Sequence, residues 1–165
     1  MESEQLLSAL KKEARQITDQ DICLARAAIF DSVKDLPEKY RRAYSSDYFS
    51  HLYQAFQELR ICRYPDKSEP IDDEEYRSLL VRICHQTDDG NSKHKAFHRF
   101  ASVVIPYLVF IAKRTIHPVG MIFPGGLMIV SHEGEYYCPV KNKQSDVDVA
   151  VCDLCRCRDS EELDP

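Results

Sequence analysis

Four cysteines near the end of the chain are the residues best suited to chemistry. Cys152, Cys155 and Cys157 form the run C-x-x-C-x-C, and Cys138 precedes them on a stretch with the composition of a β-strand. Thiolates at this short spacing can bind one ion without strain, and zinc takes four such ligands in a tetrahedron. Iron–sulfur clusters also take cysteine thiolates, usually at longer spacing. We therefore predict a zinc or iron–sulfur site built on Cys138, Cys152 and Cys155.

The sequence leaves the fourth ligand open. Cys157, His117, His132 and a non-protein ligand are all candidates. Four protein ligands would indicate a structural site, whereas three, with His117 nearby, would leave a position for substrate or water. In the second case His117 would act as proton donor or acceptor. Because no acid–base pair or phosphate-binding loop is apparent, we favour a structural or accessory role and leave enzymatic activity open.

The same segment is compatible with other functions. A metal-dependent or iron–sulfur enzyme, or a redox or cluster-handling factor, would use the same thiolates. A redox pair of Cys152 and Cys155 fits less well, since the βαβ unit that normally carries such a pair is not apparent. Without a metal, the segment would be a protein-docking surface built on Phe123, Pro124 and Tyr137, which implies a protein partner that the sequence does not identify.

Composition limits the class of protein and its surroundings. The chain has 165 residues, a net charge of −5 and 30% charged residues, which fits one soluble domain and disfavours general nucleic-acid binding. Its first residues lack the apolar core of a secretory signal, and its longest nearly apolar run, 101–112, is short for a membrane span. We therefore expect a cytoplasmic protein with no membrane partner. In that reducing compartment, we do not expect the seven cysteines to form a disulfide framework.

The elements that must position the cysteines are mainly α-helical. Apolar residues recur at helical spacing in five stretches, and the last of these is apolar on nearly all sides. The predicted helices span residues 2–16, 18–36, 37–62, 72–86 and 93–114. We expect about five helices arranged around the buried helix 93–114, which Pro106 should kink. The chain is predicted to be a single domain, with a helical body at 1–116 and a Pro-, Gly- and Cys-rich segment at 117–165.

A β-hairpin is predicted inside the terminal segment. Residues 126–131 and 135–140 are rich in branched and aromatic side chains and flank the turn residues 132–134. The three cysteines outside this segment, Cys23, Cys62 and Cys84, are interpreted as small buried apolar residues.

The terminal segment resembles a known family. The runs HPVGMIFPGG and YYCPVKNKQ, followed by C-x-x-C, are similar to domain of unknown function family 2115, uncharacterised proteins of methanogenic archaea. The helical lead-in IPYLVFIAKRTIHPVG is similar as well, so the resemblance extends over the whole chain. The matching positions are His117, Pro118, Gly120, Phe123, Pro124, Gly125, Gly126, Tyr137, Cys138, Pro139, Cys152 and Cys155. Cys157 departs from the family pattern, which favours His117 or an open position as fourth ligand. The resemblance implies an anaerobic archaeal cytoplasm and adds no reaction.

Overall fold

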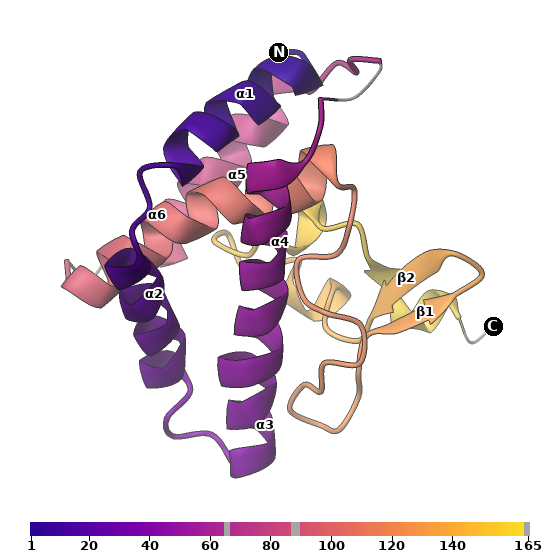
Figure 1. Cartoon of the computed structure of the whole chain (residues 1–165). Helices are drawn as coiled ribbons and strands as arrows, with labels where there is room; N and C mark the ends of the chain where they lie inside the picture. The colour runs from indigo at the N-terminus through magenta and orange to yellow at the C-terminus, as the bar shows by residue number, and fades with distance from the viewer. Residues whose placement is uncertain (65–66, 87–89, 164–165) are drawn as a thin grey trace.

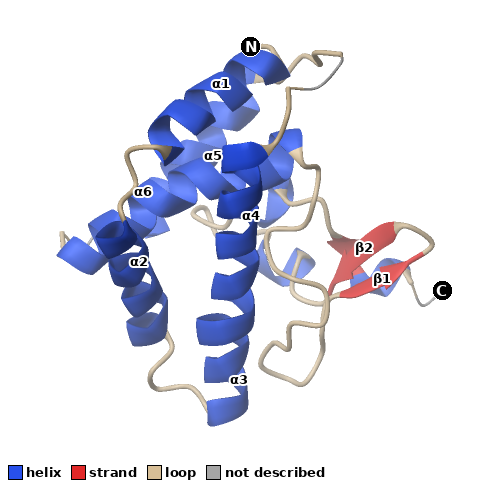
Figure 2. Cartoon of the chain, in the orientation of Figure 1, coloured by secondary structure: helices blue, strands red, loops and turns tan. Residues whose placement is uncertain are grey.

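A computed structural model of the chain describes residues 1–64, 67–86 and 90–163. The protein is mainly α-helical and carries a small three-stranded sheet near its C-terminus (Figures 1 and 2). The helices are α1 (Ser3–Ala14), α2 (Asp19–Ser32), α3 (Glu38–Arg42), η1 (Ala43–Tyr48), α4 (Phe49–Ile61), α5 (Asp73–Gln86), α6 (Ser92–Pro106) and η2 (Tyr107–Ile111), with short 3-10 turns η3 (Asn142–Gln144), η4 (Cys152–Leu154) and η5 (Ser160–Glu162). The strands are β1 (Val130–His132), β2 (Glu135–Cys138) and β3 (Arg158–Asp159). The prediction of five helices is confirmed when α3, η1 and α4 are counted as one continuous helix.

Helix α6 forms the centre of the helical body, as its apolar sequence predicted. It packs against α1, α2, α4 and α5, and it crosses behind α4 in Figure 1. Phe100 on α6 is fully buried, and its ring lies 6.1 Å from that of Phe49 and 5.5 Å from that of Phe56. The same core continues into the terminal segment through Met121, Ile129 and other buried residues. The segment is therefore packed onto the body by hydrophobic contact.

Two helices change to π-helical hydrogen bonding where their sequences weaken the α-helix. Pro106 cannot donate a backbone hydrogen bond, and the five residues of η2 follow it directly. The N–H of Ala112 then bonds the carbonyl of Tyr107 at 2.8 Å, five residues back. In η1, the Ser45 hydroxyl donates to the carbonyl of Arg41 at 2.7 Å, a bond that competes with the helix ladder. Tyr44 and Tyr48, whose rings contact the terminal segment, lie in η1.

The N-terminus of α2 is closed by a capping box. The Thr18 hydroxyl oxygen accepts a hydrogen bond from the N–H of Asp21 at 3.2 Å, and the Asp21 carboxylate accepts one from the N–H of Thr18 at 2.9 Å. These bonds satisfy backbone donors that the helix itself cannot satisfy. The bond from the Thr18 N–H, together with one from the Thr18 hydroxyl, lowers the pKa of the Asp21 carboxyl.

Removing this cap is expected to reduce stability moderately. We predict that Thr18→Ala lowers the free energy of unfolding by about 1 kcal/mol, because it leaves helix N–H groups without their partner. Urea unfolding followed by circular dichroism measures the change. Ser50→Ala, at an exposed position inside α4, is the control and should change stability by less than about 0.5 kcal/mol. Equal effects of the two substitutions would contradict the capping argument.

The hairpin forms as predicted, but it belongs to a larger sheet. Glu133 and Gly134 have φ angles of 50° and 82°, the two positive values that a type I′ turn requires. Strand β1 pairs antiparallel with β2, and β2 also pairs parallel with β3, so that Cys138 lies opposite Asp159. The Asp159 carboxylate accepts hydrogen bonds from the N–H groups of Asn142 at 3.0 Å and Glu161 at 2.8 Å. These hydrogen bonds connect β3 and the start of η5 to the segment that follows β2.

The cysteines of the helical body differ from the prediction. Cys23 and Cys84 are exposed, and Cys62 is only partly buried. Helix periodicity did not place these small residues on the buried faces, and their apolar character alone was a weak argument for burial. Within the described part of the chain, no helix is both long enough and apolar enough to cross a membrane.

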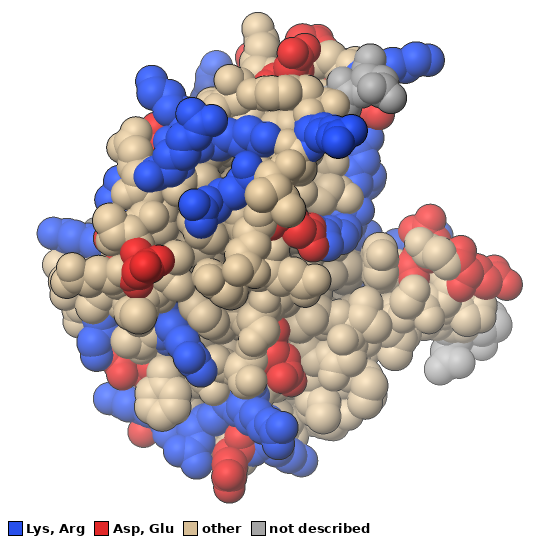
Figure 3. All heavy atoms as spheres, viewed as in Figure 1, with Lys and Arg blue, Asp and Glu red and all other residues tan. Residues whose placement is uncertain are grey.

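Charge is unevenly distributed over the surface. On the face shown in Figure 3, Lys, Arg, Asp and Glu are interspersed over the helices, whereas the lower right, where the loop after η2 lies, shows few charged atoms. The sequence explains this, because residues 115–132 include no Lys, Arg, Asp or Glu.

Candidate thiol site and adjacent cleft

The structure brings four cysteines of the terminal segment together. Cys138, Cys152, Cys155 and Cys157 line one small cavity of about 20 Å³, together with His117 and the side chain of Lys141. A cavity of this size holds about one water-sized particle. Cys138 and Cys157 are buried, and the other two thiols are partly buried. The structure therefore brings Cys138 close to the C-x-x-C run.

Strand pairing and one lysine position these cysteines. Cys138 ends β2, and Cys157 immediately precedes β3, which runs beside β2. Cys152 opens the turn η4, and Cys155 follows it. The Lys141 ammonium group donates to the carbonyls of Cys152 at 2.9 Å and Cys155 at 3.0 Å. Lys141 thereby fixes the C-x-x-C turn against the end of β2. The sequence analysis missed this residue, although its place three residues after Cys138 was a signal.

Neighbouring hydrogen-bond donors affect the pKa of two of the thiols. Hydrogen bonds from the Cys157 thiol and from backbone N–H groups, including that of Ile116, lower the pKa of the Cys155 thiol to about 6. Burial raises the pKa of Cys138, but the N–H groups of Val140 and Lys141 donate to its sulfur and oppose this effect. Donors of this kind stabilise the thiolate form of a cysteine. In metal sites, similar hydrogen bonds hold the ligand side chains in place.

The other two thiols are held in the protonated form. Burial, reinforced by the neighbouring Cys138 and Cys155, raises the pKa of Cys152 to about 11. Donation of its own hydrogen bond to Cys155 raises the pKa of Cys157. The four sulfurs therefore interact electrostatically. Ionising one thiol raises the pKa of the next unless a cation is present.

The cluster does not have the geometry of a formed metal site. Among residues 1–64, 67–86 and 90–163, no group of three His, Cys, Asp or Glu side chains is arranged to hold a metal ion. Of the two histidines considered as fourth ligand, His132 lies exposed beside the hairpin turn and does not line the cavity. His117 does line it.

His117 lies between the thiol cavity and a much larger cleft. Its ring contacts that of Tyr48, with centroids 4.6 Å apart, and meets the edge of Phe123 at 5.7 Å. Burial, with a smaller contribution from the charge of His51, lowers the pKa of His117 to about 4. The imidazole is therefore neutral at neutral pH, with one ring nitrogen able to donate and the other able to accept a hydrogen bond.

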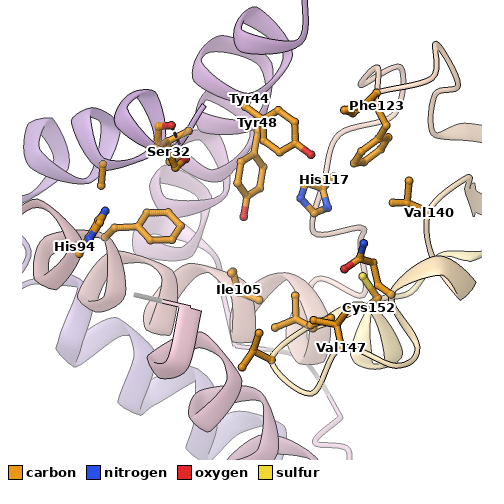
Figure 4. Close-up of a pocket in the computed structure, with 18 residues that line it drawn as sticks. Ser32, Tyr44, Tyr48, His94, Ile105, His117, Phe123, Val140, Val147 and Cys152 are labelled. Atoms are coloured by element: carbon orange, nitrogen blue, oxygen red, sulfur yellow. Dashed lines mark hydrogen bonds between the residues drawn. The ribbon is translucent and has the colours of Figure 1, made fainter. Parts of the chain in front are cut away.

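The large cleft has a volume of about 630 Å³ and extends between the helical body and the terminal segment. One wall comes from α2 and η1 and another from α6, and the terminal segment closes the remaining side (Figure 4). His94 and Ser32 lie at one end of Figure 4, and Cys152 and Phe123 lie at the other. His117 and Cys152 line both the cleft and the thiol cavity, so the two spaces meet there.

Tyr44 and Tyr48 belong to this site, although helical spacing indicated only a packing role for them. Tyr48 is 9% exposed and Tyr44 is partly buried, and their rings contact the terminal segment at His117 and Phe123, respectively. Sequence periodicity correctly placed them on the inner face of their helix. It could not show that part of the terminal segment lies at a distance from this face and leaves a cleft.

The docking surface considered from the sequence is not formed. Phe123 and Tyr137 are 4% and 8% exposed, because their rings pack inward, and only Pro124 of the three is exposed. Phe123 instead packs edge-on against Tyr44, with centroids 6.3 Å apart. These aromatic residues join the terminal segment to the helical body.

Taken together, the architecture defines a small helical protein whose cysteine-rich terminal module closes one side of a cleft. The chain belongs to the family described as "Uncharacterized protein conserved in archaea" (DUF2115), whose model matches residues 2–160. The resemblance seen in the sequence is thereby confirmed.

Relatives from methanogens match over nearly the whole chain. A UPF0305 protein of Methanococcus maripaludis is 33% identical over 171 residues, covering 99% of this chain and 100% of that protein. A UPF0305 protein of Methanocaldococcus jannaschii is 33% identical over 164 residues, covering 99% of each. One from Methanothermobacter thermautotrophicus is 26% identical over 153 residues, covering 92% of each. No solved structure matches the chain.

Proposed function

We propose that the protein binds a metal ion, most simply zinc, through Cys138, Cys152, Cys155 and Cys157. The observation that carries the proposal is the convergence of the four thiols on one small cavity, in which hydrogen-bond donors around Cys155, from the Cys157 thiol and from backbone N–H groups, lower the pKa of the Cys155 thiol. Such donors stabilise a protonated buried thiol only slightly, because its sulfur is a weak hydrogen-bond acceptor. A thiolate needs them, and a thiolate is the form that binds metal.

The position of the four thiols supports the same conclusion. They come from the end of β2, the turn η4 and the residue before β3, and they surround a space of about 20 Å³. Mutual repulsion would oppose ionisation of all four, and a divalent cation would remove that penalty. Because no three such side chains among the described residues are arranged to hold an ion, binding requires the cysteine side chains to rotate toward the cavity and lose their protons.

The role that we propose for this site is structural or accessory. A four-thiolate site would hold the C-x-x-C turn and β3 against the hairpin, which is a small element with little stability of its own. Zinc is the simplest candidate because the spacing within C-x-x-C-x-C is shorter than that usual for iron–sulfur clusters. We place the protein in the cytoplasm, where thiols stay reduced and available for metal.

A second function is favoured by the junction of the thiol cavity with the cleft. Cys152 and His117 line both spaces, so a metal held by the other thiols would lie next to a volume that can take a substrate. In this case the protein would be a metal- or cluster-dependent enzyme or a cluster-handling factor, with His117 as the neighbouring proton donor or acceptor.

Elemental analysis tests the proposed site. We expect protein purified without oxygen to carry about one zinc per chain and to lack visible absorbance. Cys155→Ser should weaken zinc binding by more than about 100-fold, because loss of a direct ligand exceeds the effect of losing a supporting hydrogen bond. Cys84→Ser is the matched control, since Cys84 is exposed on α5 and lies outside the cavity.

The outcomes separate the candidates. Loss of cooperative unfolding in Cys155→Ser would support a structural role, and unchanged folding with lost metal would support the second function. Iron with sulfide and a broad visible absorbance would replace zinc by a cluster. Protein that binds neither metal would contradict the proposal.

A further inference from the structure

The cleft presents hydrogen-bonding groups that the protein itself does not use. Tyr48 is 9% exposed, and within the described residues its hydroxyl has no hydrogen-bond partner in the protein. The His117 imidazole likewise makes ring contacts and no hydrogen bond to any described residue. Both groups line the cleft, so they are available to hydrogen-bond a molecule that occupies it.

The walls around these groups are suited to an aromatic ring. Tyr44 and Phe123 meet edge to face, with centroids 6.3 Å apart and planes at 88°, and Phe97 faces the cleft from α6. Aromatic side chains favour a further ring at similar edge-to-face or offset distances. A volume of about 630 Å³ is in the range of pockets that hold small organic molecules.

The cleft also selects against charge. The described residues that line it are mostly aliphatic or aromatic, and they include no Lys, Arg, Asp or Glu. A charged ligand would lose its hydration here without gaining an opposite charge. A neutral ligand has a smaller desolvation penalty, and hydrogen bonds to the protein offset that penalty.

We propose that the cleft binds an uncharged heteroaromatic molecule whose ring packs against the aromatic wall formed by Tyr44, Tyr48 and Phe123. Its polar edge, with a donor beside an acceptor, would pair with the Tyr48 hydroxyl and the His117 imidazole. This geometry places the polar edge at the end of the cleft that adjoins Cys152. The inference is independent of the proposed metal, because the groups that recognise the ligand are not the thiols.

A set of matched bicyclic probes tests the ligand class. The probes are quinolin-2-one, which has adjacent donor and acceptor, naphthalene, which has neither, and quinoline-2-carboxylate, which is charged. Calorimetric or fluorescence titration of the full-length protein should give the tightest binding for quinolin-2-one. Naphthalene is expected to bind about 10-fold more weakly, since it makes no hydrogen bond, and the carboxylate should bind more weakly still.

Two variants locate the binding in the cleft. Tyr48→Phe keeps the ring and removes the hydroxyl, so it should weaken quinolin-2-one about 10-fold while leaving naphthalene unchanged. Val147→Trp fills the rim of the cleft from a side chain that is 40% exposed, and it should abolish binding of both. The control is Val119→Trp, at a position that is 49% exposed and does not line the cleft, and it should bind as the unmodified protein does.

Three results would overturn the inference. One is equal affinity for the neutral and charged probes, and another is binding that survives Val147→Trp. The third is the absence of measurable binding by any probe at millimolar concentration. Repeating the titration with Cys155→Ser separates the two proposals, because a ligand site independent of metal should be retained in that variant.

Discussion

Phe100→Ala is expected to lower the free energy of unfolding by about 3–5 kcal/mol, because it removes a fully buried ring from the centre of the core. The ring packs against Phe49 and Phe56 on the helix that carries the cleft tyrosines. Those neighbours sit on a continuous helix and cannot move in freely to fill the space, so most of the cavity would remain. Chemical denaturation of the two proteins in the same buffer measures the loss.

The matched control is Phe30→Ala on α2. The Phe30 side chain is 53% exposed, so the same chemical change there should cost less than about 1 kcal/mol. If Phe100→Ala and Phe30→Ala had similar effects, α6 would not be the centre of the core. Because α6 also lines the cleft, Phe100→Ala should weaken any ligand binding there as a secondary effect.

Acidification is expected to reduce stability through His117. Its pKa in the folded protein is about 4, against an ordinary value of 6.5, because burial disfavours the charged ring. Between these two values the unfolded chain binds more protons than the folded one, so the free energy of unfolding falls as the pH falls. Because part of the ring is accessible from the cleft, we expect a contribution of about 1–2 kcal/mol between pH 7 and pH 4.5, which is less than the full pKa difference would give.

The contribution is measured as a difference between two proteins in the presence of a chelator. His117→Gln should lose less stability than the unmodified protein over this pH range, because Gln does not titrate. The groups that face His117 include Tyr48, His51 and Cys152, and they are the same in both proteins. His132→Gln, on the exposed hairpin, should behave as the unmodified protein does. An NMR titration that places the His117 midpoint above pH 6 would contradict the argument.

Local features of the fold were predictable from the sequence because they depend on neighbouring residues. The capping box at Thr18 and Asp21 follows from side chains three residues apart. The hairpin turn follows from Glu133-Gly134 between two strand-like runs. Apolar periodicity likewise identified α6 as the buried helix, since a helix that is apolar on nearly all sides must be covered by others.

Strand β3 was not predicted. Of the features that the sequence analysis missed, this strand matters most for the arrangement of the thiol site. It has only two residues, Arg158 and Asp159, which is too short for any alternation of polar and apolar side chains to be visible. Its parallel pairing with β2 nevertheless brings Cys157 beside Cys138. The family pattern led us to discount Cys157, whereas the structure buries it in the thiol cavity.

The sequence by itself determined which residues are the candidates for chemistry: the cysteines of the C-x-x-C-x-C run, Cys138 and His117. It also determined the helices that carry the rest, because periodicity and capping are local properties of the chain. Only the tertiary structure decided that Lys141 holds the cysteine turn, that His132 lies outside the site, and that a cleft opens beside His117. These depend on contacts between segments far apart in the chain, and on space left between surfaces, which no local pattern encodes.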